Sequence, residues 1–121
     1  MKNILLVSAV MMLMSTLANA QMVSNIPLKN LSAEYIKLHA GYRAGRKMVV
    51  HLDFGQVNEA FNAKDMLLTN DEGLALEFNS MIHALNYLNE QGYELFNIYS
   101  AGTDGDMVPF YIMKRKEEKV N

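Results

Sequence analysis

Histidine is the side chain whose charge changes near neutral pH, and this chain carries three of them. Two, His39 and His51, lie in segments where apolar and polar residues alternate as in β-strands. On paired strands both imidazoles point to the same side of the sheet as Tyr35, Lys37 and Asp53. A register with Lys37 opposite His51 leaves His39 diagonal to that histidine. The two imidazoles could then share a zinc ion with Asp53.

A solvated strand face that binds no metal is the alternative for these residues. No His-x-His or His-Glu-x-x-His spacing sets a ligand geometry. We therefore predict no metal ligand and interpret the group as a candidate interaction surface. That surface consists of Tyr35, Lys37, His39, His51 and Asp53.

Other catalytic patterns are absent from the sequence. The chain has no cysteine, which excludes a thiol nucleophile, a thiolate zinc cluster and an iron–sulfur centre. No Gly-x-Ser-x-Gly elbow occurs. Carboxylates for glycoside hydrolysis are available at Glu34, Asp53, Glu77 and Glu94. A domain of one helix and a few short strands leaves little room for a sugar-binding cleft, so we predict no catalytic residue, no cofactor and no enzymatic activity.

The glycine-rich and basic segments do not predict binding to phosphate or nucleic acid. Residues 41–45 lack the lysine and the strand-to-helix context of a phosphate loop. The basic residues at 114–116 are followed directly by two glutamates, and mixed signs dilute the local field. We interpret this segment as a solvated strand end.

The first twenty residues have the organisation of an export signal. Lys2 gives a cationic start, residues 4–17 are an almost unbroken apolar run, and Ala18 and Ala20 are the small residues that a leader peptidase requires. We predict a signal peptide over residues 1–20 and a periplasmic or secreted protein with no membrane-embedded segment after cleavage. An uncleaved anchor helix is disfavoured, because a span needs about 20 apolar residues.

Removing the signal peptide leaves a mildly acidic chain. Lys2 is its one charged residue, so 10 basic residues remain against 13 acidic ones, a formal net charge of −3. This charge is too small to attract a partner over long range. Four of the ten methionines also lie in residues 1–20, which argues against a methionine-based copper site.

The remaining chain predicts one domain. Residues 21–32 show no periodicity and contain a proline, which predicts an extended arm or linker before a single α+β domain over residues 33–121. Alternation over residues 33–40 and 47–54 predicts two strands. Two glycines lie between these strands, so an antiparallel hairpin is the simplest connection.

Residues 56–77 have the least regular pattern. Val57, Ala60 and Phe61 suggest a helical turn, and residues 70–73 suggest a turn between two short apolar runs. We predict a short excursion from the sheet with a minor hairpin.

An amphipathic helix is predicted over residues 80–91. Asn79 or Ser80 can cap its start, and Gly92 suits a left-handed stop. His83 lies off the apolar stripe, which predicts that it is exposed. The apolar stripe consists of Phe78, Met81, Ile82, Leu85 and Leu88.

Two further strands, over residues 93–100 and 108–116, follow the helix and are joined by a loop of turn-forming residues. The order is therefore strand, strand, helix, strand, strand. This order predicts an α+β fold with one helix packed on a mainly antiparallel sheet.

Four short motifs carry a resemblance to known proteins. They are a Leu-Asn pair in the helix at residues 85–86, Gly-Tyr-Glu-Leu at residues 92–95, Lys-Arg-Lys at residues 114–116 and Asp-Phe-Gly-Gln at residues 53–56. The chain thereby resembles a group of small exported bacterial proteins of Bacteroides type, of unknown function, which usually have tryptophan at the position of Tyr93. The resemblance implies the α+β fold and assigns no catalytic residue.

Both faces of the last two strands carry apolar side chains, because both alternating sets of their residues are apolar. A single helix can cover only one of these faces. Residues 56–77, another subunit or an exported partner must cover the second face. We predict a binding or interaction domain that acts through a sheet face or an edge strand, with an unidentified envelope or secreted protein, or a second copy, as partner. The alternatives are a self-associating structural module and a small secreted metal-binding protein or enzyme that uses His39, His51 and Asp53.

Overall fold

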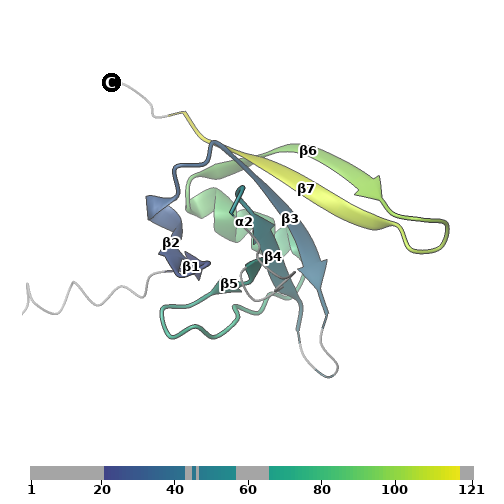
Figure 1. Ribbon diagram of the computed structural model, residues 1–121, viewed down its shortest axis with the longest axis horizontal. Coiled ribbons are helices and arrows are strands. Elements are labelled where there is room, and N and C mark those ends of the chain that lie inside the picture. The colour runs from purple at the N-terminus through teal and green to yellow at the C-terminus, as the bar shows by residue number, and fades with distance from the viewer. Residues whose placement is uncertain (1–20, 43–44, 46, 57–65, 118–121) are drawn as a thin grey trace, which may run out of the picture.

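A four-stranded antiparallel sheet with one α-helix forms the body of the computed structural model, which describes residues 21–42, 45, 47–56 and 66–117 (Figure 1). The strands lie in the order β4-β3-β7-β6. The elements are β3 (Tyr35–Gly41), β4 (Val49–Asp53), α2 (Met81–Glu90), β6 (Tyr93–Ala101) and β7 (Val108–Arg115). The predicted α+β class and the order strand, strand, helix, strand, strand are confirmed.

The alternation of side chains decides which face of the sheet the helix covers. Ile36 of β3 and Met113 of β7 are direct cross-strand partners, and both are almost fully buried. They share one hydrophobic core with Leu38 and with Ala84 and Leu88 of α2. We call this side of the sheet the helix face and the opposite side the outer face.

A second, small sheet has the order β2-β1-β5, with β1 (Met22–Val23), β2 (Ile26–Pro27) and β5 (Leu68–Thr69). The prediction of an arm or linker at residues 21–32 is wrong, because β1, β2 and the 3-10 helix η1 (Leu28–Asn30) occupy that segment.

The apolar residues of this first segment anchor it to the core. Val23, Leu28 and Leu31 are at most 4% exposed. Ser24 and Asn25 both have positive φ, as the tight turn of a two-residue hairpin loop requires. Elements of two or three residues are too short to produce a periodic pattern, which explains why the sequence suggested an extended arm.

The hairpin of β3 and β4 forms as predicted, but its register differs by two residues. Lys37 pairs with Asp53 and His39 pairs with His51, so the register considered for a shared zinc ion, with Lys37 opposite His51, does not form. That register would have placed Met48 in the ladder. The Met48 carbonyl instead accepts a hydrogen bond of 2.8 Å from the Phe78 amide, ahead of the helix.

Helix α2 begins as the sequence predicts. The Ser80 side chain accepts a hydrogen bond of 3.2 Å from the His83 amide, and His83 Nδ1 accepts one of 3.1 Å from the Asn79 amide. Ser80 is therefore the N-cap, and His83 is exposed as expected. Gly92 follows the C-cap with a φ of 103°.

The buried face of α2 differs from the predicted stripe at two positions, Ile82 and Ala84. Ile82 is 66% exposed, whereas Ala84 and Leu88 are fully buried and Met81 and Leu85 are partly buried. The buried set has the i, i+3, i+4, i+7 spacing of one helix face, and Ile82 lies to one side of that face. A small alanine permits close packing on the sheet, and this outweighs the hydrophobicity of the isoleucine.

The minor hairpin predicted around residues 70–73 is present. The Asn70 amide donates to the Leu74 carbonyl at 2.8 Å, and the Leu76 amide donates to the Leu68 carbonyl at 2.9 Å. The Asn70 side chain accepts from two backbone amides within the turn. The predicted helical turn at residues 57–61 and the signal peptide at residues 1–20 lie outside the described residues.

The hairpin of β6 and β7 extends beyond the rest of the body. Strand β3 pairs with β7 only at residues 111–114, so the distal end of the hairpin is a two-stranded ribbon that projects past α2 and β3 (Figure 1). A β-bulge between Leu95 and Asn97 interrupts the ladder near the base of the ribbon. Within the described residues, no helix has the length and apolar character needed to span a membrane.

Candidate interaction surface

The five residues of the candidate interaction surface lie together on the outer face. Tyr35, Lys37 and His39 alternate along β3, and His51 and Asp53 alternate along β4. Direct cross-strand pairing of His39 with His51 and of Lys37 with Asp53 places these side chains on one side of the sheet.

The two imidazoles stack on each other. The ring centroids of His39 and His51 lie 4.8 Å apart with an interplanar angle of 12°. Gly41 makes room for this arrangement, since a Cβ there would lie 2.6 Å from His51 Nε2. His39 Nδ1 is buried and has no hydrogen-bond partner within the described part of the chain. Burial, followed by the neighbouring charges of His51 and Lys37, holds the pKa of His39 below its ordinary value of 6.5.

Asp53 is already engaged on both carboxylate oxygens. Its Oδ2 lies 3.7 Å from Lys37 Nζ, and its Oδ1 accepts a hydrogen bond of 2.8 Å from the Gly55 amide. Among residues 21–42, 45, 47–56 and 66–117, no group of three or more histidine, cysteine or acidic side chains could hold a metal ion. The hypothesis that His39, His51 and Asp53 share a metal ion therefore gains no support from their arrangement.

A row of rings crosses all four strands of the outer face. Tyr99 of β6 stacks on Phe110 of β7 at 5.3 Å, and Phe110 meets His39 edge to face at 5.5 Å. The stacked pair of His39 and His51 continues the row onto β4. Lys37 Nζ also lies 5.2 Å from the centre of the Phe110 ring, a cation–π contact. These rings pack against one another, and Tyr99 at the end of the row remains 41% exposed.

A second ring cluster lies beside this row. Tyr35 and Phe96 meet edge to face at 5.5 Å, and Lys114 Nζ lies 5.8 Å from the Tyr35 ring centre. The candidate surface named from the sequence omitted Phe96, Tyr99 and Phe110. The apolar alternation on both faces of the last two strands contained their signal, but only the pairing of β7 with β3 places them beside the histidines.

A shallow pocket of about 310 Å³ lies at one end of the outer face. Its polar side chains include Lys37 and Asp53, which pair with each other. The pocket therefore presents a neutralised ion pair between apolar and aromatic walls. Its lining residues are Tyr35, Ile36, Lys37, Asp53, Phe54, Gly55 and Ile112.

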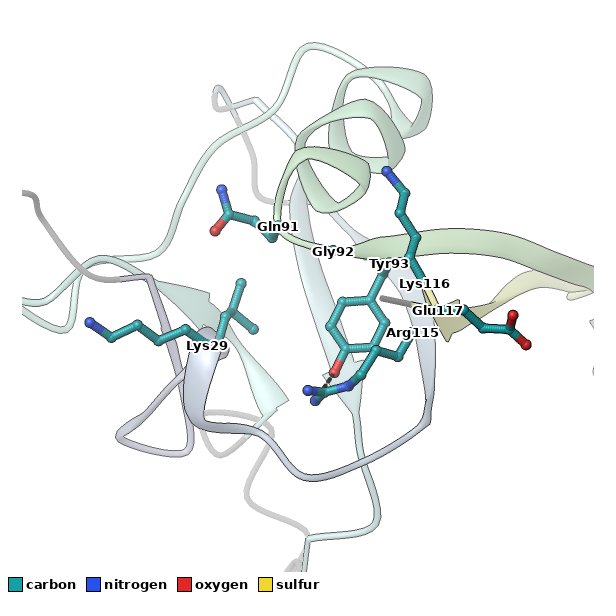
Figure 2. Close-up of a pocket in the computed structure, with 8 residues that line it drawn as sticks. Lys29, Gln91, Gly92, Tyr93, Arg115, Lys116 and Glu117 are labelled. Carbon is teal, nitrogen blue, oxygen red and sulfur yellow. Dashed lines mark hydrogen bonds between the residues drawn. The ribbon is translucent and has the colours of Figure 1, made fainter. Parts of the chain in front are cut away.

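Another pocket of about 340 Å³ lies where the end of β7 meets the N-terminal segment, and Arg115 dominates it (Figure 2). Arg115 Nη2 donates to the Leu31 carbonyl, to the Ala33 carbonyl at 3.3 Å and to the Tyr93 hydroxyl at 3.0 Å. The Tyr93 hydroxyl in turn donates to the Ala33 carbonyl at 3.1 Å. Figure 2 shows the guanidinium directed toward that hydroxyl.

This network makes Arg115 a structural residue. The interpretation of residues 114–116 as a solvated strand end is therefore wrong for Arg115, the middle residue of the three. The partly buried guanidinium ties the last strand to the N-terminal segment through two backbone carbonyls. Lys116 is exposed, and its Nζ donates to the carbonyl and side-chain oxygens of Asn89 at 2.9 and 2.8 Å. A cation at that position complements the negative end of α2. Both side chains thus have structural partners.

Exposed apolar side chains concentrate on the projecting hairpin. The described residues include eleven large hydrophobic side chains that are exposed, and six of them belong to β6, β7 and their connection. We call these six residues the hairpin patch. They are Leu95 (46% exposed), Phe96 (60%), Ile98 (50%), Tyr99 (41%), Met107 (56%) and Val108 (38%).

No protein-family model matches this chain, and searches of curated proteins and of solved structures returned no significant match. The resemblance to small exported bacterial proteins stays a prediction. Functional inference therefore depends on the surfaces described above.

Proposed function

We propose that this protein is an exported, non-enzymatic binding domain and that the hairpin patch is its binding surface. The observation that carries the proposal is the gathering of six exposed apolar side chains on a hairpin at the edge of the sheet. Exposed apolar side chains concentrated in this way are typical of a surface that binds another protein. They lie on both faces of the hairpin, since Ile98 is opposite Tyr111 and Tyr99 is opposite Phe110. The apolar run and small residues at positions 1–20 support the export of the chain.

The outer face offers less to a ligand than the hairpin patch does. Lys37 and Asp53 pair with each other, and the rings of His39 and Phe110 pack against their neighbours. A ligand would have to displace these contacts. The hairpin patch also includes rings in contact with neighbours, Phe96 with Tyr35 and Tyr99 with Phe110. All six of its side chains are nevertheless 38–60% exposed, and we therefore place the binding surface there.

Strand addition is the binding mode that fits this geometry. Strand β6 lies at the end of the strand order, so an extended segment of a partner can continue the ladder beside it once it replaces the hydrogen bond of 2.9 Å that the Ile98 amide donates to Asn97 Oδ1. Backbone hydrogen bonds then supply affinity, and contacts with side chains such as Phe96 and Ile98 supply specificity.

Affinity capture from an extract of the source cells tests the proposal. The wild-type protein, Ile98→Lys and Ile82→Lys are compared side by side. Ile82 is the matched control because it is an equally apolar, 66% exposed residue that lies on the helix. We expect a protein that is retained by the wild type and by Ile82→Lys and is lost with Ile98→Lys. Identical sets of captured proteins from all three would contradict the proposal.

A further inference from the structure

Gln21 becomes the first residue of the processed chain when the signal peptide ends at Ala20. A free α-amine and a side-chain amide then lie on the same residue. Attack of the α-nitrogen on Cδ closes a five-membered ring, and groups held together in this way react far more readily than separate molecules do. An α-amine titrates just above neutral pH, so part of it is neutral and nucleophilic there.

The fold fixes the chain directly after Gln21. Met22, the first residue of β1, pairs with Pro27 on one side and with Thr69 on the other. The Gln21 carbonyl accepts a hydrogen bond of 2.8 Å from the Leu28 amide. None of these contacts uses the α-nitrogen or the side-chain amide of Gln21, which are the two groups that ring closure consumes. Ring closure therefore leaves these contacts in place.

An uncharged ring suits the surroundings of residue 21 better than an ammonium group does. Gln21 is partly buried, and its side chain lies near the buried Tyr87 hydroxyl on α2. An ammonium group in this position loses part of its hydration. Glu90 also acts on this hydroxyl, but Glu90 is exposed, so water screens its attraction for a cation. The ring keeps one carbonyl and one N–H, which offer the hydroxyl an acceptor and a donor.

The start of β1 is a place where the loss of residues would damage the core. Strand β1 is the middle strand of the β2-β1-β5 sheet, and Val23 is fully buried in the hydrophobic core. Exopeptidases that shorten a chain from its N-terminus act on a free α-amine. A ring at residue 21 removes that amine and therefore protects β1.

We infer that Gln21 is a modification site that forms an N-terminal pyroglutamate after the signal peptide is removed. The α-nitrogen bonds to Cδ of the same residue, the Cδ–Nε2 bond breaks, and Nε2 leaves as ammonia with a proton from the α-amine. The reaction needs no oxidant, reductant or further reactant. The inference rests on the export that belongs to the proposed function, and it is independent of the hairpin patch.

Intact mass measurement of the processed protein tests the inference. The complete sequence is expressed in a bacterial host, and the wild type is compared with Gln21→Ala, which keeps the residues before the cleavage site and lacks the side-chain amide. Each protein is measured when freshly purified and after several days at mildly alkaline pH. We expect most wild-type molecules to become lighter by the mass of one ammonia, whereas Gln21→Ala should keep its mass.

Two further readouts connect the lost ammonia with the ring. Tandem mass spectrometry should locate the loss on residue 21. Stepwise N-terminal degradation of the incubated wild type should give no residue, because a ring nitrogen does not react as an amine. Treatment of the N-terminal peptide with pyroglutamyl peptidase should restore the degradation, starting at Met22. Gln21→Ala should give a readable sequence before and after incubation.

The outcomes separate the ring from the export of the chain. A wild type that starts at Gln21 and keeps its full mass and a readable amine after incubation would overturn the inference and leave export standing. A loss of ammonia that is equal in Gln21→Ala would overturn it as well. A product that retains residues 1–20, or that starts at another residue, would overturn both the inference and the predicted cleavage site.

Discussion

At the scale of single residues, the outer face contains a titratable group in an environment that disfavours its charge. His39 is stacked on His51, lies beside Phe110 and has Lys37 two residues before it in β3. Its pKa lies below the ordinary value of 6.5, first because of burial and then because of the charges of His51 and Lys37, with Asp53 acting in the opposite direction. The folded protein therefore binds fewer protons than the unfolded chain as the pH falls below 6.5.

We accordingly expect the free energy of unfolding to fall as the pH falls from about 6.5 toward the lowered pKa of folded His39. The contribution of this residue should be fully present above pH 6.5, since the imidazole is then neutral in both states. Urea unfolding at a series of pH values measures the slope. His39→Gln removes the titrating group and should flatten the profile in this range. An equal slope in the variant would show that His39 does not cause the effect.

Arg115 supports a second prediction at this scale. Arg115→Met keeps much of the side-chain stem but leaves the Ala33 carbonyl and the Tyr93 hydroxyl without this donor. Because hydrogen bonds to a charged group are lost in a partly buried site, we expect a loss of about 2 to 3 kcal/mol in the free energy of unfolding. Lys116→Met is the matched control and should lose only about 0.3 to 1 kcal/mol, since this exposed cation acts at a helix end. Equal losses measured by urea unfolding would contradict the structural role of Arg115.

At the scale of elements, the helix shows how packing refines an amphipathic pattern. The sequence predicts the presence of α2, its Ser80 cap and the burial of Leu88, because spacing and capping are local properties. Ile82 was assigned to the wrong side. Its position is compatible with either edge of the apolar stripe, and in the fold the fully buried Ala84 joins the core while Ile82 is exposed.

Leu88→Ala and Ile82→Ala test this orientation. Leu88 is fully buried, so its truncation should reduce the free energy of unfolding by about 2 to 5 kcal/mol. Ile82 is mostly exposed, and its truncation should change stability by less than about 0.5 kcal/mol. Thermal or urea unfolding measures both values. A large loss for Ile82→Ala together with a small one for Leu88→Ala would reverse the assigned faces.

The strands show the same division between local and non-local information. Alternation located β3, β4, β6 and β7 to within a few residues, because the period of two is visible in any half-buried strand. The register of β3 with β4 depends on contacts that the residues before β4 make elsewhere in the fold. Met48 bonds to Phe78, thirty residues later in the chain, and the pairing of the strands shifts accordingly.

At the scale of the whole molecule, the N-terminal segment predicts that the chain is exported and that its first twenty residues are removed. Residues 1–20 have the charge, apolar run and small residues of a signal peptide, with Ala20 as the last residue before the expected cleavage site. Expression of the complete sequence in a bacterial host should yield a processed protein outside the cytoplasm. N-terminal sequencing and intact mass should identify Gln21 as its first residue. A product that retains Met1 and fractionates with membranes would contradict the prediction.

The sequence by itself determined the class of the fold, the sites of its main elements, the lack of thiol chemistry and the group of residues that share the outer face. These properties follow from composition and short-range periodicity. The tertiary structure decided the register that stacks His39 on His51, the burial of Val23, Leu28 and Leu31, the structural use of Arg115 and the exposure of the hairpin patch. Each of these depends on contacts between segments distant in sequence, and a linear pattern does not specify which segments meet.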